Sequence, residues 1–228
     1  MTPRALFLDF DGLMCDTERA ARRSWEETWA EFGVAFPEEL WERIEGRADG
    51  ERVALNALSA AVGRQVGPKV RDARASRKRE LSAKEPLRPG VDQLLGLAQR
   101  CGLPMAVVSS SPAEWVVGHL ARLGVRDHFA LVITGEAAVR HKPAPDLYLV
   151  ALAQMGVPPS AAEALEDSVV GIRAARSAGL RCVAVPTSDE AAKRATEADL
   201  VVAGFEDYLR QAEWTDMDQR QRKDQWAR

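Results

Sequence analysis

The chain has 228 residues, a net charge of −3, and 46% hydrophobic and 29% charged residues. This balance is typical of a globular protein with one large domain, or with one domain and a smaller insert. It gives no reason to expect nucleic acid as a partner, and no apolar run approaches the ~20 residues that span a bilayer. Three widely spaced cysteines, Cys15, Cys101 and Cys182, fit reduced thiols better than disulfides or a zinc site. We therefore expect a monomer in the cytoplasm that binds neither nucleic acid nor membrane.

Short apolar runs alternate with helical patterns along most of the chain. The first run, 5–8, ends in Asp9-Phe10-Asp11-Gly12 and predicts a buried strand followed by a turn. Further strands are predicted at 105–108, 130–133, 162–165, 182–185 and 200–202, and helices at 89–102, 112–123, 143–155 and 168–178. Because strands that alternate with helices are joined by right-handed crossovers, the pattern predicts an α/β fold with a parallel sheet.

Residues 18–86 interrupt this alternation. Their apolar residues recur at helical spacing in two stretches, Trp25-Trp29-Phe32 and Val53-Ala57-Ala60. We expect about four helices and no strand here, forming a cap that is inserted into a core made of 1–17 and 87–212. The polar tail, 213–228, is expected to be a terminal helix or disordered.

Two carboxylates, Asp9 and Asp11, follow the first predicted strand. Two residues apart on an extended chain, they point to one side, and the carboxyl end of a strand in an open parallel sheet is where ligands bind. Two acids close together are destabilising unless a cation uses them. Mg²⁺ prefers such oxygen ligands and accepts phosphate oxygens as well. The alternative is that both residues only end the strand and begin a turn.

Three later segments carry polar residues just before a predicted helix. Ser109-Ser110-Ser111 offers hydroxyls and backbone N–H groups to a phosphate, although Ser-rich helix starts are common. Lys142 can reach a phosphate as a point charge, but most single lysines are only solvated. Glu166-Asp167 offers a second acidic pair for the same cation, or an ordinary helix cap.

Together, the four segments resemble the four motifs of the haloacid dehalogenase superfamily. The resemblance rests on Asp9-Phe10-Asp11-Gly12 with Asp16-Thr17-Glu18, then Ser109, Lys142-Pro143 and Glu166-Asp167, and it runs from about residue 5 to about residue 203. The stretches 142–146 and 166–171 are particularly similar to the branch that contains sugar-phosphate phosphatases and β-phosphoglucomutase. The resemblance implies a Rossmann-like sheet with a helical cap inserted just after the first motif.

The resemblance also implies a role for each matching residue. Asp9 resembles the nucleophile that forms an aspartyl phosphate, and Asp11 the general acid and base. Lys142 resembles the cation between the nucleophile and the phosphoryl group, and Ser109 and Ser110 lie where phosphate oxygens bind. The implied Mg²⁺ ligands are Asp9, the carbonyl of Asp11, Glu166 and Asp167. The implied reaction is Mg²⁺-dependent hydrolysis of a small phosphorylated metabolite, such as a sugar phosphate.

Other functions stay open. Asp11 favours an oxygen leaving group that needs a proton, because the dehalogenases and phosphonatases of this superfamily lack an acid there. β-Phosphoglucomutases carry a cap histidine five residues after the position of Asp16, where this chain has Ala21, so hydrolysis is favoured over mutase activity. A phosphoaspartate signalling module also uses acids, a hydroxyl and a lysine, but the insert and the Asp9–Asp11 spacing disfavour it. No motif residue is replaced, which disfavours an inactive homologue.

The remaining charged and aromatic residues have simpler interpretations. Trp25, Trp29 and Trp41 are assigned to the cap interior, and His119 and His128 to the surface or to helix ends. The basic stretch Arg71, Arg74, Arg77, Lys78 and Arg79 is expected to be a solvated helix face rather than a substrate site. Arg47 lies at a cap turn that approaches the substrate in relatives, and it is equally consistent with substrate binding and with a surface arginine.

Overall fold

The computed structural model describes residues 3–47 and 49–212. A six-stranded parallel sheet forms its centre, with the strand order β3-β2-β1-β4-β5-β6. The strands are β1 (Ala5–Leu8), β2 (Met105–Val108), β3 (Leu131–Ile133), β4 (Ala162–Glu166), β5 (Arg181–Ala184) and β6 (Leu200–Val201). From β1, the chain adds β2 and β3 on one side of the sheet and then β4, β5 and β6 on the other. In such a sheet the ligand-binding crevice lies where the strand order reverses, at the carboxyl end of β1. The predicted α/β class and the parallel sheet are confirmed. The predicted tail, 213–228, lies outside the described residues.

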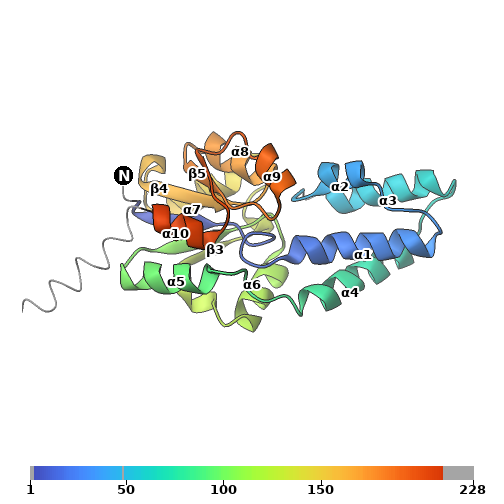
Figure 1. Ribbon diagram of the computed structural model, residues 1–228, viewed down its shortest axis with the longest axis horizontal. Coiled ribbons are helices and arrows are strands. Elements are labelled where there is room, and N and C mark those ends of the chain that lie inside the picture. Colours follow the sequence, from blue (N-terminus) through green and yellow to red (C-terminus); the bar gives the residue numbers. More distant parts are fainter. Residues whose placement is uncertain (1–2, 48, 213–228) are drawn as a thin grey trace, which may run out of the picture.

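Helices cover both faces of the sheet (Figure 1). One face packs against α5 (Val91–Arg100), α6 (Ala113–Arg122) and α10 (Phe205–Gln211), and the other against α7 (Asp146–Met155) and α8 (Val169–Ser177). A further short helix, α9 (Asp189–Arg194), precedes β6. Since both faces are covered, the central strand β1 is apolar at every position and fully buried.

The inserted segment forms α1 (Thr17–Glu31), α2 (Glu38–Ile44), α3 (Gly50–Ala61) and α4 (Pro68–Ser82), and no strand lies among its described residues. These helices extend beyond one end of the sheet (Figure 1). They enclose a small apolar core of their own, which includes Trp25, Trp29, Trp41 and Leu58. The cap is therefore stabilised mainly from within, because its apolar faces meet one another rather than the sheet.

Three details differ from the sequence predictions. Helix α7 begins at Asp146 and not at Pro143, because the residue that precedes Pro145 is pushed out of the helical region. In α3, Ala54 and Leu58 are fully buried and Val53 and Ala57 pack against the same core, while Ala60 is exposed. The short helices α9 and α10 were missed because six or seven residues give too little periodicity to recognise.

Two connections join the cap to the sheet domain, and Arg88 ties them to the core. Cys15, in the first connection, pairs with Leu87, in the second, as an isolated bridge. The Arg88 guanidinium donates to the backbone carbonyls of Gly12 (2.8 Å), Val185 (3.0 Å) and Pro186 (3.0 Å). One side chain therefore links the turn after β1, the second connection and the end of β5.

We predict that Arg88→Ala lowers the free energy of unfolding by about 3 kcal/mol, because it leaves three partly buried carbonyls without a charged donor. Urea unfolding followed by far-UV circular dichroism measures the change. The matched control is Arg71→Ala, since Arg71 is exposed and bonds the neighbouring Asp72; it should change stability by less than about 0.5 kcal/mol. Equal effects of the two substitutions would contradict this role for Arg88.

Candidate active site

Asp9 leaves the end of β1 with its side chain buried (7% exposed). Lys142, which precedes α7 in the chain, places its ammonium 2.6 Å from Asp9 Oδ1, 2.6 Å from Glu166 Oε1 and 2.8 Å from the carbonyl of Val108. All three ammonium protons therefore have an acceptor. Burial raises the pKa of Asp9 to about 8 despite the opposing effect of Lys142. Burial alone would lower the pKa of Lys142, but Asp9 and Glu166 outweigh it and raise that pKa.

A cluster of three acids, Asp9, Glu166 and Asp167, could hold a metal ion. Each offers a carboxylate oxygen, and the three oxygens lie within 4.8 Å of one another. Lys142 balances one of the three negative charges, so a divalent cation would balance the rest. In the part of the chain that the structure describes, Glu166 Oε2 is buried and has no hydrogen-bond partner. The residues therefore fit a hard cation such as Mg²⁺.

Glycines make room for two of these acids. Gly12 adopts a φ of +79°, and a side chain on it would overlap the carboxylate of Asp167. Gly171, in the first turn of α8, lies against the carboxylate of Glu166 so closely that any Cβ there would overlap it. Tyr148 fixes Glu166 from the other side by donating its hydroxyl to Oε1. The acidic cluster is thus defined by the backbone as much as by the acids themselves.

Asp11 lies apart from this cluster and accepts hydrogen bonds on both of its carboxylate oxygens. Oδ1 accepts from the Thr17 hydroxyl (2.6 Å) and the Trp115 indole N–H (2.7 Å), and Oδ2 accepts from the Ser111 hydroxyl (2.6 Å). Burial would raise the pKa of Asp11, but Lys78 and these hydrogen bonds outweigh it and lower that pKa. The carboxylate of Asp11 is not among the clustered oxygens, so the contact that Asp11 is expected to make with a metal, through its carbonyl, stays a prediction.

The serine turn after β2 faces the same crevice. The N–H of Ser111 donates to Ser109 Oγ (3.1 Å), and the first N–H of α6, on Ala113, donates to the carboxylate of Glu136 (2.9 Å). These two backbone donors already have acceptors, so the expectation of N–H groups available to a phosphate does not hold for them. A phosphate in this turn would instead contact the hydroxyls of Ser109 and Ser110 and the ammonium of Lys142, all of which line the cavity.

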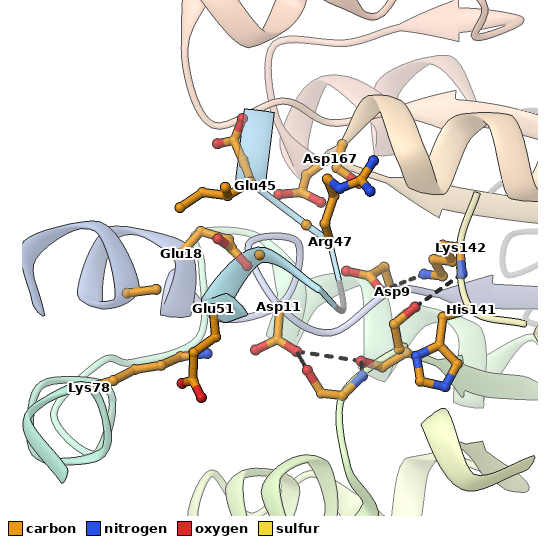
Figure 2. Close-up of a pocket in the computed structure, with 18 of the residues that line it drawn as sticks. Asp9, Asp11, Glu18, Glu45, Arg47, Glu51, Lys78, His141, Lys142 and Asp167 are labelled. Atoms are coloured by element: carbon orange, nitrogen blue, oxygen red, sulfur yellow. Dashed lines mark hydrogen bonds and ion pairs between the residues drawn. The ribbon is translucent and has the colours of Figure 1, made fainter. Parts of the chain in front are cut away.

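A cavity of about 420 Å³ lies between these residues and the cap. Its cap side carries three acids and three cations, several of them shown in Figure 2: Glu18, Glu45, Glu51, Arg47, Arg74 and Lys78. Arg47 lines the cavity, and it pairs with Asp49 (2.9 Å). Ala21, the residue at the position of the mutase histidine, lines the cavity too.

The interpretation of the basic stretch was wrong for two of its members. Arg74 is 7% exposed, stacks on Trp25 at 4.5 Å from the ring centre and pairs with Glu51. Lys78, one helical turn further along α4, lies 4.5 Å from the ring centre of Trp115. The spacing of four places both on the face of α4 that meets the cavity. The sequence could not show which face of α4 the cap turns toward the core.

Two aromatic residues near Asp11 were also misjudged. No sequence pattern pointed to Trp115, although its place in the first turn of α6, just after the serine segment, puts it at the same sheet edge. His119 lies in the last turn of α6, as one of the two expectations for it had it, but it is not at the surface: it is buried (8% exposed) and packs edge-on against Trp115 with ring centres 4.4 Å apart. Burial, and then the charge of Arg122, lower the pKa of His119. His128 lies in a short 3₁₀ turn, 126–128.

The sequence matches the haloacid dehalogenase-like hydrolase family over residues 3–179. The chain belongs to that family. It is 37% identical over 184 residues to YhcW of Bacillus subtilis, covering 80% of this chain and 83% of that protein. It is 33% identical to the fructose-1-phosphate phosphatase YqaB of Escherichia coli, covering 79% and 95%. The crystal structure of CbbY from Rhodobacter sphaeroides in complex with phosphate is 30% identical, with a TM-score of 0.69 over 93% of this chain and 96% of that one.

Membership in this family confirms the predicted superfamily and an enzyme of the hydrolase class, and it argues against a signalling module. Among the described residues, no helix is long and apolar enough to cross a membrane. The domain bounds and the roles of individual residues stay predictions, although the structure brings Asp9, Asp11, Ser109, Ser110 and Lys142 to one cavity.

We predict that Gly171→Ala lowers kcat/KM at least 100-fold, because the added methyl displaces Glu166 and, through it, Lys142. Steady-state phosphatase assays measure the loss, and thermal melting checks the fold. Gly118→Ala is the matched control: Gly118 lies in α6 with nothing within 4 Å of its missing Cβ, so alanine should keep activity and stabilise the helix by up to about 1 kcal/mol. Full activity of Gly171→Ala would show that the position of Glu166 does not depend on the space beside Gly171.

Proposed function

We propose that the protein is a Mg²⁺-dependent phosphatase that hydrolyses a small phosphomonoester, a sugar phosphate, through an aspartyl phosphate on Asp9. One observation carries the proposal: Lys142 holds the carboxylate of Asp9 beside two further acids, at the floor of a cavity that the cap closes from above. Phosphoryl transfer depends mainly on positioning and charge neutralisation, and these groups supply both.

The first half of the reaction forms the aspartyl phosphate. A carboxylate oxygen of Asp9 attacks phosphorus, and the bond from phosphorus to the ester oxygen breaks. Asp11, two residues on, gives a proton to the departing oxygen, which leaves as a neutral hydroxyl. Lys142 keeps Asp9 in place and offsets negative charge next to it. When bound at Asp9, Glu166 and Asp167, Mg²⁺ would neutralise charge on the phosphoryl oxygens.

The second half releases phosphate. Asp11, now ionised, takes a proton from water, and the water oxygen attacks phosphorus and displaces Asp9. The donors around Asp11, namely Thr17, Ser111 and Trp115, suit the ionised form that this step needs. Phosphate leaves, and both aspartates return to their starting states.

Relatives support the class of substrate. Relatives with a sequence identity of 30% or more include the fructose-1-phosphate phosphatase of Escherichia coli and the validoxylamine A 7′-phosphate phosphatase of Streptomyces hygroscopicus. A CbbY variant that is 28% identical was crystallised with xylulose-(1,5)bisphosphate. Two of these names, those of the Escherichia coli phosphatase and of the CbbY complex, refer to a phosphorylated sugar. A small polar cavity of about 420 Å³ suits a molecule of that size.

We predict that the purified protein releases phosphate from a panel of sugar phosphates in the presence of Mg²⁺ and that EDTA stops the reaction. Asp9→Asn should abolish activity while the melting temperature stays close to that of the wild type. Only a carboxylate can form the acyl phosphate. Among the described residues, Lys142 is the cation that pairs with the acidic cluster, so two of its three negative charges are left for a divalent ion. Asp72→Asn, at an exposed acid on α4, is the control and should be fully active. Full activity after chelation would show that the reaction needs no metal. If Asp9→Asn kept a tenth or more of wild-type activity, Asp9 would not be the nucleophile.

A second prediction concerns hydrolysis against mutase activity. Ala21 has no side chain that could hold Asp11 away from the aspartyl phosphate, so water should attack the intermediate before a second sugar binds. With β-glucose 1-phosphate and a bisphosphate primer, inorganic phosphate should therefore form faster than glucose 6-phosphate. Coupled assays follow the two products separately. Faster formation of glucose 6-phosphate would instead identify a β-phosphoglucomutase-type phosphotransferase.

A further inference from the structure

Trp115 makes a hydrogen bond that packing alone does not require. Its indole N–H donates to Asp11 Oδ1 at 2.7 Å, from the first turn of a helix that otherwise packs on the sheet. We infer that Trp115 is a positioning residue for the proton transfers of Asp11, which it holds at a fixed orientation toward the leaving group and the attacking water. The inference rests on the proposed phosphatase function and deepens it, because it states how the general acid is aimed.

The hydrogen bonds around Asp11 distinguish its two oxygens. Oδ1 receives two donors, the indole N–H of Trp115 and the hydroxyl of Thr17. An indole N–H can only donate, so Oδ1 stays an acceptor whenever Trp115 is in place. Oδ2 faces the hydroxyls of Ser111 (2.6 Å) and Ser109 (3.4 Å), each of which can turn to donate or to accept. The proton that Asp11 gives to the ester oxygen and later takes from water therefore travels on Oδ2.

Two neighbours hold Trp115 itself, one from the core and one from the cap. His119 packs edge-on against its ring, and Lys78 of the cap lies over the ring at 4.5 Å from its centre. His119 in turn lies 3.1 Å from a nitrogen of Arg122, which donates to the carbonyl of Glu85 in the second connection between cap and core. Trp115, His119 and Arg122 are spaced along one side of α6. The indole is thus fixed by the core, the cap and the connection between them, as a positioning group must be.

Another tryptophan supplies the comparison. Trp29 is a buried tryptophan of the cap, whereas Trp115 is partly buried, and the indole N–H of Trp29 has no partner among the described residues and does not line the cavity. Replacing tryptophan with phenylalanine at the two positions removes the same N–H and the same ring area. Only at position 115 does the change also remove a donor from the general acid.

The test compares two esters of nearly the same shape, phenyl phosphate and 4-nitrophenyl phosphate. Phenol is a poor leaving group and needs the proton from Asp11, whereas 4-nitrophenolate leaves without one. We expect Trp115→Phe to lower kcat/KM for phenyl phosphate by about tenfold or more, the usual effect of losing a hydrogen bond to a charged group, and kcat/KM for 4-nitrophenyl phosphate by less than about threefold. The ratio kcat/KM covers the steps up to departure of the aryl group, so it leaves out the attack of water that both esters share. Trp29→Phe should change kcat/KM for the two esters by the same factor.

Equal losses of kcat/KM on both esters would overturn the inference and leave Trp115 with a packing role only. If Trp115→Phe does not fold, 3-benzothienylalanine at position 115 replaces the N–H with sulfur and keeps the outline of the ring, and the same comparison of esters decides. Failure of the proposed function looks different. In that case the wild type releases no phosphate from either aryl ester or from the sugar-phosphate panel.

Discussion

The ammonium of Lys142, buried between the carboxylates of Asp9 and Glu166, is the interaction on which the site depends. Removing charges from water is costly, and an unpaired buried charge is much less favourable than a paired one. Lys142 would leave two carboxylates uncompensated if it moved, and either carboxylate would leave the ammonium short of acceptors. The three groups come from β1, the turn before α7 and the end of β4, so their attraction also fixes how these segments lie at the sheet edge. The remaining excess of negative charge is what makes the same place suitable for a divalent cation.

Much of the fold and of this charged centre could be predicted from the sequence, because both follow from local patterns. The strand before Asp9 is a short apolar run ended by a glycine turn, and parallel pairing brings the carboxyl ends of neighbouring strands to one edge. The order of polar segments after successive strands therefore predicted that Asp9, Ser109 and Glu166 would meet. Family resemblance added the roles, which spacing alone does not provide.

What the sequence could not provide depends on how the cap is rotated and docked. From the sequence, Arg74 and Lys78 were assigned to a solvated helix face, yet both line the cavity. A solvated helix face and a cavity wall can contain the same basic residues, so composition does not distinguish them. His119 and Trp115 read as ordinary helix residues, although one is buried and the other contacts Asp11. The start of α7 was misplaced for a local reason, its closely spaced prolines. Non-local contacts of single side chains, rather than the order of the elements, were therefore what sequence patterns failed to predict.

The charges on the cap side of the cavity bear on what part of a substrate they can bind. Arg74 is already paired with Glu51, Arg47 with Asp49, and Lys78 lies over Trp115 close to Asp11. At Arg74 or Arg47, a second anionic group on the substrate would have to displace a carboxylate and leave it uncompensated, whereas Lys78 has no carboxylate partner among the described residues. Hydroxyl groups make no such demand, because each can donate to a carboxylate and accept from a guanidinium without breaking the pair. At these two arginines, the cap wall is therefore better matched to hydroxyl groups, such as those of the proposed sugar phosphate, than to a second phosphate.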